Sequence, residues 1–366
     1  MAAIEAQSVS AAGTASGLPP GRRIVGLDSL RGLAAISVLL GHYTAHYHRL
    51  YGHGEGLAFH YPYAFLGVLL FFMISGFVIL MTAERAAGPL DFAWARFSRL
   101  YPAYWTAVAV TFTVVTLFPL PGRRVSLGGA LLNLTMVQNL LGVQSVDGVY
   151  WTLQVELCFY AMVLGLLLCG GIRFIEPVLM GLVGLGAVDE LLLAGVKSDW
   201  LVRLRHLLLL EYAYAFLIGV TLYRSLTGRR WWHLPVVAGC LAWAFWFAPR
   251  PHFYAAAGFT PLLYAATRGH LALLGARWLV LLGTISYPLY LTHQNIGYVI
   301  IRAGYRRGLN PNVSVAVAAA AALAIALAIT FLVERPAMAL LRRFRPVRPS
   351  VPAAQSPLSS PAAAVA

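Results

Sequence analysis

The stretch "LDSLRGLAAISVLLGHY", residues 27 to 43, combines an apolar run with three ionisable side chains. Asp28, Arg31 and His42 stand among leucines, alanines and valines. Such side chains are costly in the hydrocarbon of a bilayer, so where they occur they usually mark a functional site or a buried polar network. The first question is therefore whether this segment lies in a membrane.

The composition of the chain predicts an integral membrane protein. Hydrophobic residues make up 60% of the 366 positions and charged residues only 11%, and the mean hydropathy is +0.73. A spanning helix needs about 20 mostly apolar residues, and continuous apolar runs without two-residue alternation favour helices over a barrel. We predict an all-α bundle of about ten transmembrane helices, near residues 24–45, 62–83, 102–121, 151–171, 175–196, 200–223, 231–248, 253–267, 278–301 and 312–333.

The basic residues predict the orientation. Arginines are more numerous at the alternate ends and loops that would be cytoplasmic if the chain starts inside, so we expect both termini in the cytoplasm and the bundle in the inner or plasma membrane. The net charge of +14 is spread over these loops, which favours anionic lipid over nucleic acid as the partner. We expect a disordered N-terminus (1–21), a transmembrane domain (22–340) and a disordered tail (341–366).

Helical geometry places two of the costly side chains on one stripe. Arg31 and His42 are eleven residues apart, which is three turns plus about 20°, with a rise of about 16 Å. Asp28, one turn before Arg31, falls near the same stripe. A polar seam would thus run from the inner face towards the bilayer centre, either as a structural network or as a reaction site.

Several blocks together resemble one enzyme family. D-x-L-R-G with a histidine at R-x10-H in the first span is followed by "GVLLFFMISGF" (67–77), "RFSRLYPAYW" (96–105), "WTLQVELCFY" (151–160), "SYPLYLTH" (286–293) and "ERP" (334–336). In order, these blocks resemble the stand-alone form of the membrane-bound acyltransferase 3 family. The resemblance implies transfer of an acyl group, most often acetyl, from cytoplasmic acyl-CoA to a hydroxyl of a glycan, a lipid-linked sugar or a natural product.

The chemistry needs a base that removes the proton of the attacking hydroxyl. Histidine titrates near neutral pH, so His42 is the candidate base. Glu156 is a candidate to steady the charge that forms on His42; it is equally suited to pair with Arg31 or to join two helices. Asp28 and Arg31 complete the candidate catalytic set.

The remaining candidates come from the other blocks. Ser75, Tyr287 and backbone amides at a break in the "SGF" segment are candidate hydrogen-bond donors to the oxyanion. Ser75 is also a candidate acyl carrier, or simply a small residue that permits close helix packing. His293 matches a family block and has either a structural or a substrate-facing role.

Arg96 and Arg99 are close together just before the third predicted span. Guanidinium groups bind phosphate in a bidentate manner, so we expect these two arginines to hold the phosphates of acyl-CoA. Ordinary positive-inside anchoring is the alternative.

A metal site is a weaker interpretation of the histidines at positions 42, 46, 48, 53 and 60, because no cysteine joins them. We expect no metal, and we expect the segment 46–60 to form an outer loop that meets the acceptor.

Two other function classes fit a helical bundle with buried charges. A proton- or anion-coupled transporter or flippase would use Asp28, Arg31, His42 and Glu156 as a relay. A structural or assembly subunit would tolerate loss of the seam.

Overall fold

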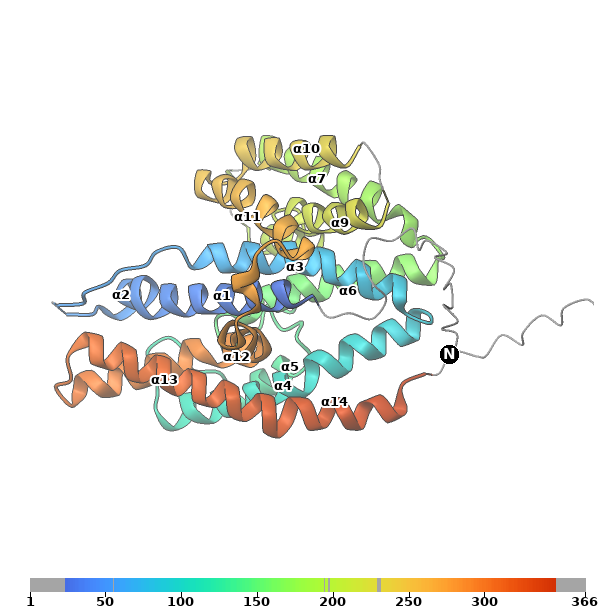
Figure 1. The fold of residues 1–366 in the computed structure, drawn as a ribbon. Helices are drawn as coiled ribbons and strands as arrows, with labels where there is room; N and C mark the ends of the chain where they lie inside the picture. Colours follow the sequence, from blue (N-terminus) through green and yellow to red (C-terminus); the bar gives the residue numbers. More distant parts are fainter. Residues whose placement is uncertain (1–23, 55, 194, 197, 229–231, 347–366) are drawn as a thin grey trace, which may run out of the picture.

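The computed structural model describes residues 24–346, except for residues 55, 194, 197 and 229–231. The expected N-terminal segment 1–21 and the tail from residue 347 lie outside this range. The described chain is helical and has no strand, which confirms the predicted all-α class. Figure 1 shows most helices running across the view, with α7, α10 and α11 uppermost and α13 and α14 lowest. The helices are α1 (Val25–Gly41), α2 (Tyr47–Tyr51), α3 (Ala64–Arg85), α4 (Pro89–Leu117), α5 (Leu127–Asn133), α6 (Tyr150–Leu168), α7 (Ile175–Leu193), α8 (Asp199–Leu207), α9 (Ala213–Thr227), α10 (His233–Phe247), α11 (Arg250–Arg268), α12 (Arg277–Arg306), α13 (Pro311–Ile329) and α14 (Arg335–Leu341).

Each predicted apolar stretch overlaps these helices, with two differences. α4 begins at Pro89, well before the predicted stretch 102–121, so Arg96 and Arg99 lie within the helix and not before it. The stretch 200–223 is divided between α8 and α9, and Leu209 in the connection has a positive φ of 59°. Within the described residues, four helices are long and apolar enough to cross a membrane: Ala64–Arg85, Pro89–Leu117, Tyr150–Leu168 and the continuous segment Pro311–Phe344. The count of about ten spans stays a prediction.

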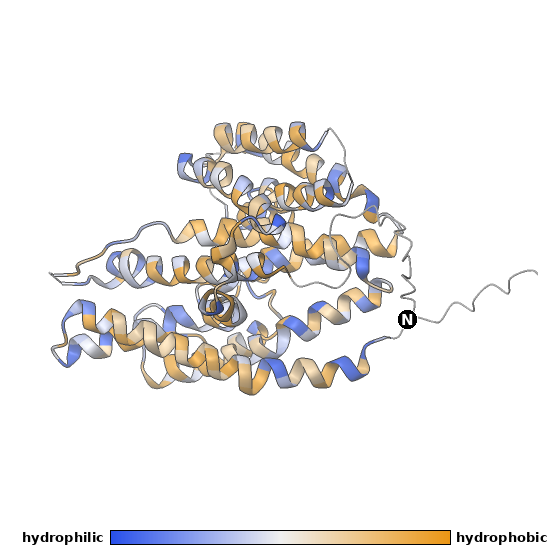
Figure 2. Ribbon diagram, in the orientation of Figure 1, coloured by the Kyte–Doolittle hydropathy of each residue, from blue (hydrophilic) through white to orange (hydrophobic). Residues whose placement is uncertain are grey.

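The outward faces of the bundle are apolar. Leu234, Trp246 and Leu332 expose 79%, 74% and 75% of their surface, and Figure 2 shows orange, apolar residues along the middle of most helices and blue ones more often near their ends. Large apolar side chains exposed in this way need a non-aqueous surrounding. The arrangement is that of a membrane protein.

The centre of the bundle is the packing of α1 against α3 and α12. Gly32 of α1 faces Gly283 of α12, and a Cβ on either residue would collide with the backbone of the other helix. Small residues let membrane helices approach closely. This contact brings the seam of α1 directly against α12.

Two single-turn π-helices interrupt the α-helical pattern. One, His42–His46, follows α1, and the other, Thr330–Glu334, joins α13 to α14. π-helical turns are rare and occur frequently at functional sites, since the extra residue leaves backbone carbonyls free for other partners. Both turns carry residues of the family blocks, His42 and Glu334.

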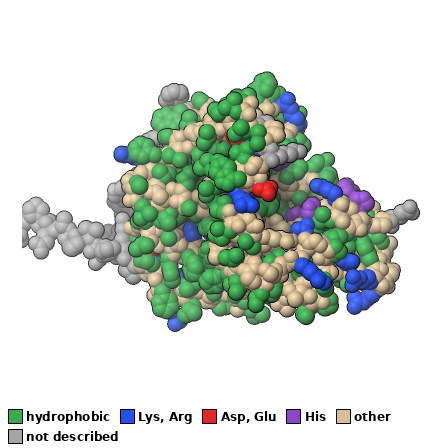
Figure 3. Space-filling model, turned by 180° about the vertical axis from the view of Figure 1, so that it is seen from behind, with side chains coloured by type: hydrophobic (Ala, Val, Ile, Leu, Met, Phe, Trp, Pro, Cys, Tyr) green, Lys and Arg blue, Asp and Glu red, His purple; other side chains and the backbone are tan. Residues whose placement is uncertain are grey.

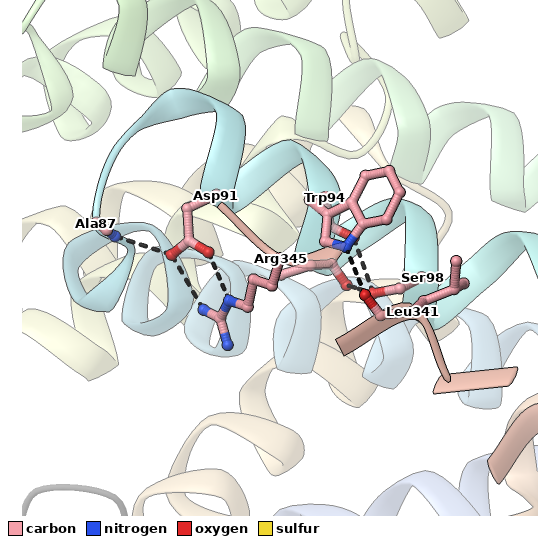
Figure 4. Close-up of polar contacts among 7 residues, drawn as sticks. Ala87, Asp91, Trp94, Ser98, Leu341 and Arg345 are labelled. Carbon is pink, nitrogen blue, oxygen red and sulfur yellow. Dashed lines mark hydrogen bonds and ion pairs between the residues drawn. The ribbon is translucent and has the colours of Figure 1, made fainter. Parts of the chain in front are cut away.

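The C-terminal segment runs back along the start of α4 (Figure 4). The Arg345 guanidinium donates to both carboxylate oxygens of Asp91 at 2.5 and 3.0 Å. The indole N–H of Trp94 donates to the carbonyl oxygen of Leu341 at 3.0 Å. The described structure therefore continues to Pro346, beyond the expected start of the disordered tail at residue 341.

Candidate active site

His42 and His293 form a hydrogen-bonded pair between the first π-helix and α12. The Nδ1 atom of His42 lies 2.8 Å from Nε2 of His293. The other nitrogen of His293, Nδ1, lies 2.9 Å from the carbonyl oxygen of Tyr290 and 3.1 Å from that of Leu289. His293 is fully buried, so this network has no competition from bulk water.

The network assigns the protons of the neutral pair. Carbonyl oxygens only accept, so Nδ1 of His293 carries its proton and Nε2 of His293 is an acceptor. Nδ1 of His42 must then donate to it. Nε2 of His42 is left with its lone pair, which is the form that a proton-accepting imidazole requires.

His53 braces the π-helix that carries His42. Its Nε2 lies 2.7 Å from the carbonyl oxygen of Tyr43 and 3.1 Å from that of Thr44, which are carbonyls within the π-helical turn. Its Nδ1 contacts the hydroxyl of Tyr305, and the Tyr43 hydroxyl donates to the carbonyl oxygen of His293 at 2.7 Å. Burial lowers the pKa of the His53 imidazole, which favours the neutral ring.

The histidine-rich segment pairs with tyrosines and with backbone oxygens. His46 Nδ1 lies 2.6 Å from the hydroxyl of Tyr298, which follows His293 by five residues in α12. The part of the chain that the structure describes contains no group of three His, Cys, Asp or Glu side chains arranged to hold a metal ion. The segment expected to be an outer loop is partly helical, since α2 occupies Tyr47–Tyr51.

A narrow chamber lies further along the seam. It is lined by side chains of α1, α3, α6 and α12, among them Arg31, Ser75, Glu156, Tyr287 and Tyr290. Its volume of about 30 Å³ accommodates about two water molecules. An acyl chain therefore enters only when side chains around it move.

Glu156 is held by two hydroxyl groups. Its Oε1 accepts from Ser75 at 2.5 Å and from Tyr160 at 2.6 Å. No described carboxylate forms an ion pair with Arg31, although Arg31 and Glu156 line the same chamber. Of the three roles considered for Glu156, this geometry corresponds most closely to the joining of two helices, α3 and α6.

The "SGF" segment does not break its helix. α3 is continuous from Ala64 to Arg85, and Gly76 within it permits close contact with the backbone of Phe216 in α9. The amides of Ser75 to Phe77 thus belong to helical turns and are not free donors. The expectation of an oxyanion site from these amides is wrong.

Arg96 and Arg99 differ in their surroundings. Arg99 forms an ion pair with Glu334 of the second π-helix, and its guanidinium lies 5.5 Å from the centre of the Tyr287 ring. Arg96 lies 6.0 Å from the centre of the Tyr160 ring, and its buried Nε has no hydrogen-bond partner among the described residues. Only Arg96 therefore presents an unused buried donor.

Tyr290 separates the chamber from the histidine pair. Its side chain lines the chamber, its hydroxyl lies 2.6 Å from Thr152 Oγ1, and its ring centre lies 5.8 Å from that of His293. Neither His42 nor His293 lines the chamber itself. Tyr287, Tyr290 and His293 nevertheless follow one another along α12.

Asp28 lies in the first turn of α1, at the N-terminal end of the seam, and does not line the chamber. Its backbone packs against Gly283 of α12. Sequence reasoning did not single out Tyr160, Tyr290 or Glu334, although each lies within one of the quoted blocks. Tyr290 stands one helical turn before His293, a spacing that would have placed it beside that ring.

A family model described as an acyltransferase domain, Acyl_transf_3, matches residues 24–334. The chain belongs to the acyltransferase 3 family. The predicted resemblance is thus confirmed, and the protein is an O-acyltransferase. It is similar to the exopolysaccharide production protein ExoZ of Rhizobium meliloti (strain 1021), with 26% identity over 336 residues, covering 81% of this chain and 95% of ExoZ. No solved structure matches this member of the acyltransferase 3 family.

Proposed function

We propose that this protein transfers an acyl group, most simply acetyl, from cytoplasmic acyl-CoA to a hydroxyl of a carbohydrate, with His42 as the general base. The observation that carries the proposal is the hydrogen bond from His42 Nδ1 to His293, which leaves Nε2 of His42 able to accept a proton. The printed name of ExoZ supports a polysaccharide acceptor. A lipid-linked glycan or another natural product is compatible with the same chemistry.

The reaction follows from that lone pair. Nε2 of His42 takes the proton of the acceptor hydroxyl as its oxygen attacks the thioester carbonyl carbon. The tetrahedral intermediate then expels the thiolate of coenzyme A, the C–S bond breaks, and the imidazolium returns its proton to the sulfur. The products are the O-acyl ester and free coenzyme A, so no oxidant, metal or second co-substrate enters the balance.

The donor would lie along the seam. We assign the anionic end of acyl-CoA to Arg31 and Arg96, since neither guanidinium is engaged by a described carboxylate and arginine binds phosphate strongly. Arg99, paired with Glu334, orients the Tyr287 ring at the chamber wall. Ser75 and Glu156 shape the chamber, and Asp28 anchors its inner end.

The topology is part of the proposal. About ten spans, both termini in the cytoplasm and location in the inner membrane would put Arg31, Arg96 and Arg99 on the side where acyl-CoA is made. The arrangement of α1 supports this, since Arg31 precedes His42 along the helix that starts the bundle.

The test uses the purified protein in detergent with acetyl-CoA and an acidic exopolysaccharide fragment. An acyltransferase releases free coenzyme A and forms an ester of the fragment, whereas a transporter releases neither without two compartments. Release that depends on the acceptor supports the proposal, and its absence with folded protein that binds acetyl-CoA contradicts it.

A further inference from the structure

A group of hollows lined by arginines lies outside the chamber at Arg31. One hollow, of about 480 Å³, is lined by Arg123, Gln144, Trp151, Arg203 and His206 among others. This volume is in the range of ordinary small-ligand sites. The hollow is more than ten times larger than the chamber at Arg31.

Two further hollows adjoin it. A hollow of about 280 Å³ shares Arg123 with the first and contains Arg124. The other, of about 480 Å³, shares Gln144 with the first, contains Arg124, and adds Arg302. Shared lining residues make the three hollows one continuous surface, which we call the arginine vestibule, defined by Arg123, Arg124, Gln144, Trp151, Arg203 and Arg302.

The position of the vestibule connects it to His42. Arg123 stands two residues after Pro121, in the loop between α4 and α5. The Tyr51 hydroxyl at the end of α2 donates to the carbonyl oxygen of Pro121 at 3.1 Å, so the loop that carries Arg123 packs against the segment that follows His42. Figure 3 shows many Lys and Arg side chains and the His side chains towards the right-hand end of the molecule, which is the α2 end.

The charges of the vestibule are unbalanced. Arg123, Arg124, Arg203 and Arg302 have no ion-pair partner in the described part of the chain, and Asp199 is the carboxylate that lines the hollows. The guanidinium of Arg203 lies over Gly142, where a Cβ would collide with it. Gly142 has a φ of 72°, so glycine at this position both permits the turn and leaves room for the guanidinium.

The uncharged lining suits a sugar. Trp151 and His206 both line the hollow and stack on each other with ring centres 5.6 Å apart, so the lining includes aromatic surface, against which the C–H groups of a sugar ring can pack. Asn139, Gln144 and Ser145 supply amide and hydroxyl groups for sugar hydroxyls. Arginine forks supply bidentate partners for a carboxylate or a phosphate.

We propose that the arginine vestibule is the acceptor site and that it selects a carbohydrate carrying an anionic group. This inference rests on the proposed function and names the substrate class of the same reaction. The anionic group has two chemical sources, the carboxylate of a uronic acid or the phosphate of a lipid-linked sugar. Arg203 and Arg124 would bind the charge while a sugar hydroxyl reaches His42 past Arg123.

The test compares matched probes on the whole enzyme in detergent. Binding of tri-galacturonic acid is measured by calorimetry against its methyl ester, which has the same sugars without the charge. A polyprenyl pyrophosphoryl monosaccharide, compared with the free monosaccharide, tests the phosphate source. We expect one charged probe to bind about tenfold more tightly than its neutral partner and the preference to weaken as salt is raised.

Variants locate the binding. R203Q and R124Q are each expected to reduce binding of the preferred charged probe by about tenfold, with acetyl-CoA binding unchanged. R306Q is the matched control, because Arg306 is an exposed arginine outside the vestibule lining. Equal binding of charged and neutral probes, or equal effects of R203Q and R306Q, would overturn the assignment.

The two proposals fail differently. If the enzyme releases coenzyme A with a neutral acceptor as fast as with the charged one, the acceptor assignment is wrong and the proposed function stands. If no acceptor promotes release but the charged probe still binds in an Arg203-dependent manner, the vestibule stands as a site and the proposed reaction is wrong.

Discussion

His42 donates to His293 through Nδ1, and the direction of this hydrogen bond is set by two backbone carbonyls on the far side of the His293 ring. In a histidine that acts as a base, the hydrogen bond at one ring nitrogen determines which nitrogen carries the proton. Under the proposed mechanism, His293 is therefore a positioning residue for His42.

Replacing His293 separates hydrogen bonding from packing. In H293Q the side-chain carbonyl can still accept from His42 Nδ1, so we expect kcat to fall by about tenfold. H293F removes the acceptor, and kcat should fall by at least about a hundredfold, with the KM for acetyl-CoA little changed in both. Steady-state release of coenzyme A against pH measures this. Equal activities of H293Q and H293F would contradict the positioning role.

The two arginines at the start of α4 should respond differently to the same change. R96K keeps the charge but loses the fork, so the KM for acetyl-CoA should rise by about tenfold while thermal stability is little affected. R99K weakens the contact with Glu334 and should mainly lower the melting temperature. E334Q serves as the control, because it should reproduce the R99K result. A larger KM effect for R99K than for R96K would contradict the assignment of Arg96.

Replacing Ser75 tests whether the reaction forms a covalent acyl-enzyme intermediate. The Ser75 hydroxyl donates to Glu156 at 2.5 Å, so S75A should disturb the geometry of the chamber. We expect the rate of acyl transfer to fall by about tenfold but not to be abolished. Intact-protein mass spectrometry after rapid mixing of the wild type with acetyl-CoA should show no acyl-enzyme. An acylated Ser75 peptide would contradict direct transfer.

The brace at His53 predicts a pH dependence of stability. The pKa of His53 is lowered from its ordinary value of 6.5 by burial, so the unfolded chain binds the proton more readily than the folded one. Its contribution to stability is therefore present above pH 6.5 and is lost as the pH falls through the lowered folded-state value. Melting temperatures between pH 5 and 8 should decline towards acid, and the decline should be smaller in H53Q. If the melting temperature of H53Q declined towards acid as steeply as that of H270Q, which changes an exposed histidine far from His53 in the sequence, the brace would be contradicted.

The C-terminal contact drawn in Figure 4 is expected to hold α4 in place. R345Q leaves the buried Asp91 carboxylate without its bidentate partner, so the free energy of unfolding should fall by about 1–3 kcal/mol. The double variant D91N/R345Q should lower the free energy of unfolding by less than the sum of the two single variants. Thermal unfolding in detergent measures both, with R343Q as the exposed control. Strictly additive effects would show that the pair contributes nothing.

The sequence was sufficient to predict the all-α class, because long apolar runs indicate helices in a membrane. It was also sufficient to predict that Arg31 and His42 lie on one side of their helix, because their spacing is close to a whole number of turns. Arg31 lines the chamber together with Tyr287 of α12, and His42 contacts His293 of the same helix. The first π-helix could not be predicted, because the carbonyls of Tyr43 and Thr44 there contact His53, which lies outside the helical pattern. The Arg99–Glu334 ion pair could not be predicted either, because it joins segments that are far apart in the chain and are brought together by packing.

The vestibule as a whole could not be assembled from the sequence, for a similar reason. Arg123, Trp151 and Arg203 come from three separate segments, and none forms a motif with the others in the sequence. Arg203 in particular lay inside a stretch predicted as one continuous span. In the structure this stretch is divided into α8 and α9, and Arg203 of α8 lines the vestibule.

The most direct test of the central claim is the acceptor-dependent release of coenzyme A from acetyl-CoA by the purified H42Q enzyme. The matched histidine control is H270Q, because His270 is exposed and lies outside the chamber and the vestibule. If His42 removes the hydroxyl proton, H42Q will bind acetyl-CoA with unchanged affinity and unfold at the wild-type temperature, yet release coenzyme A at least about a thousandfold more slowly. A rate for H42Q within about threefold of that of H270Q would show that another group performs this step.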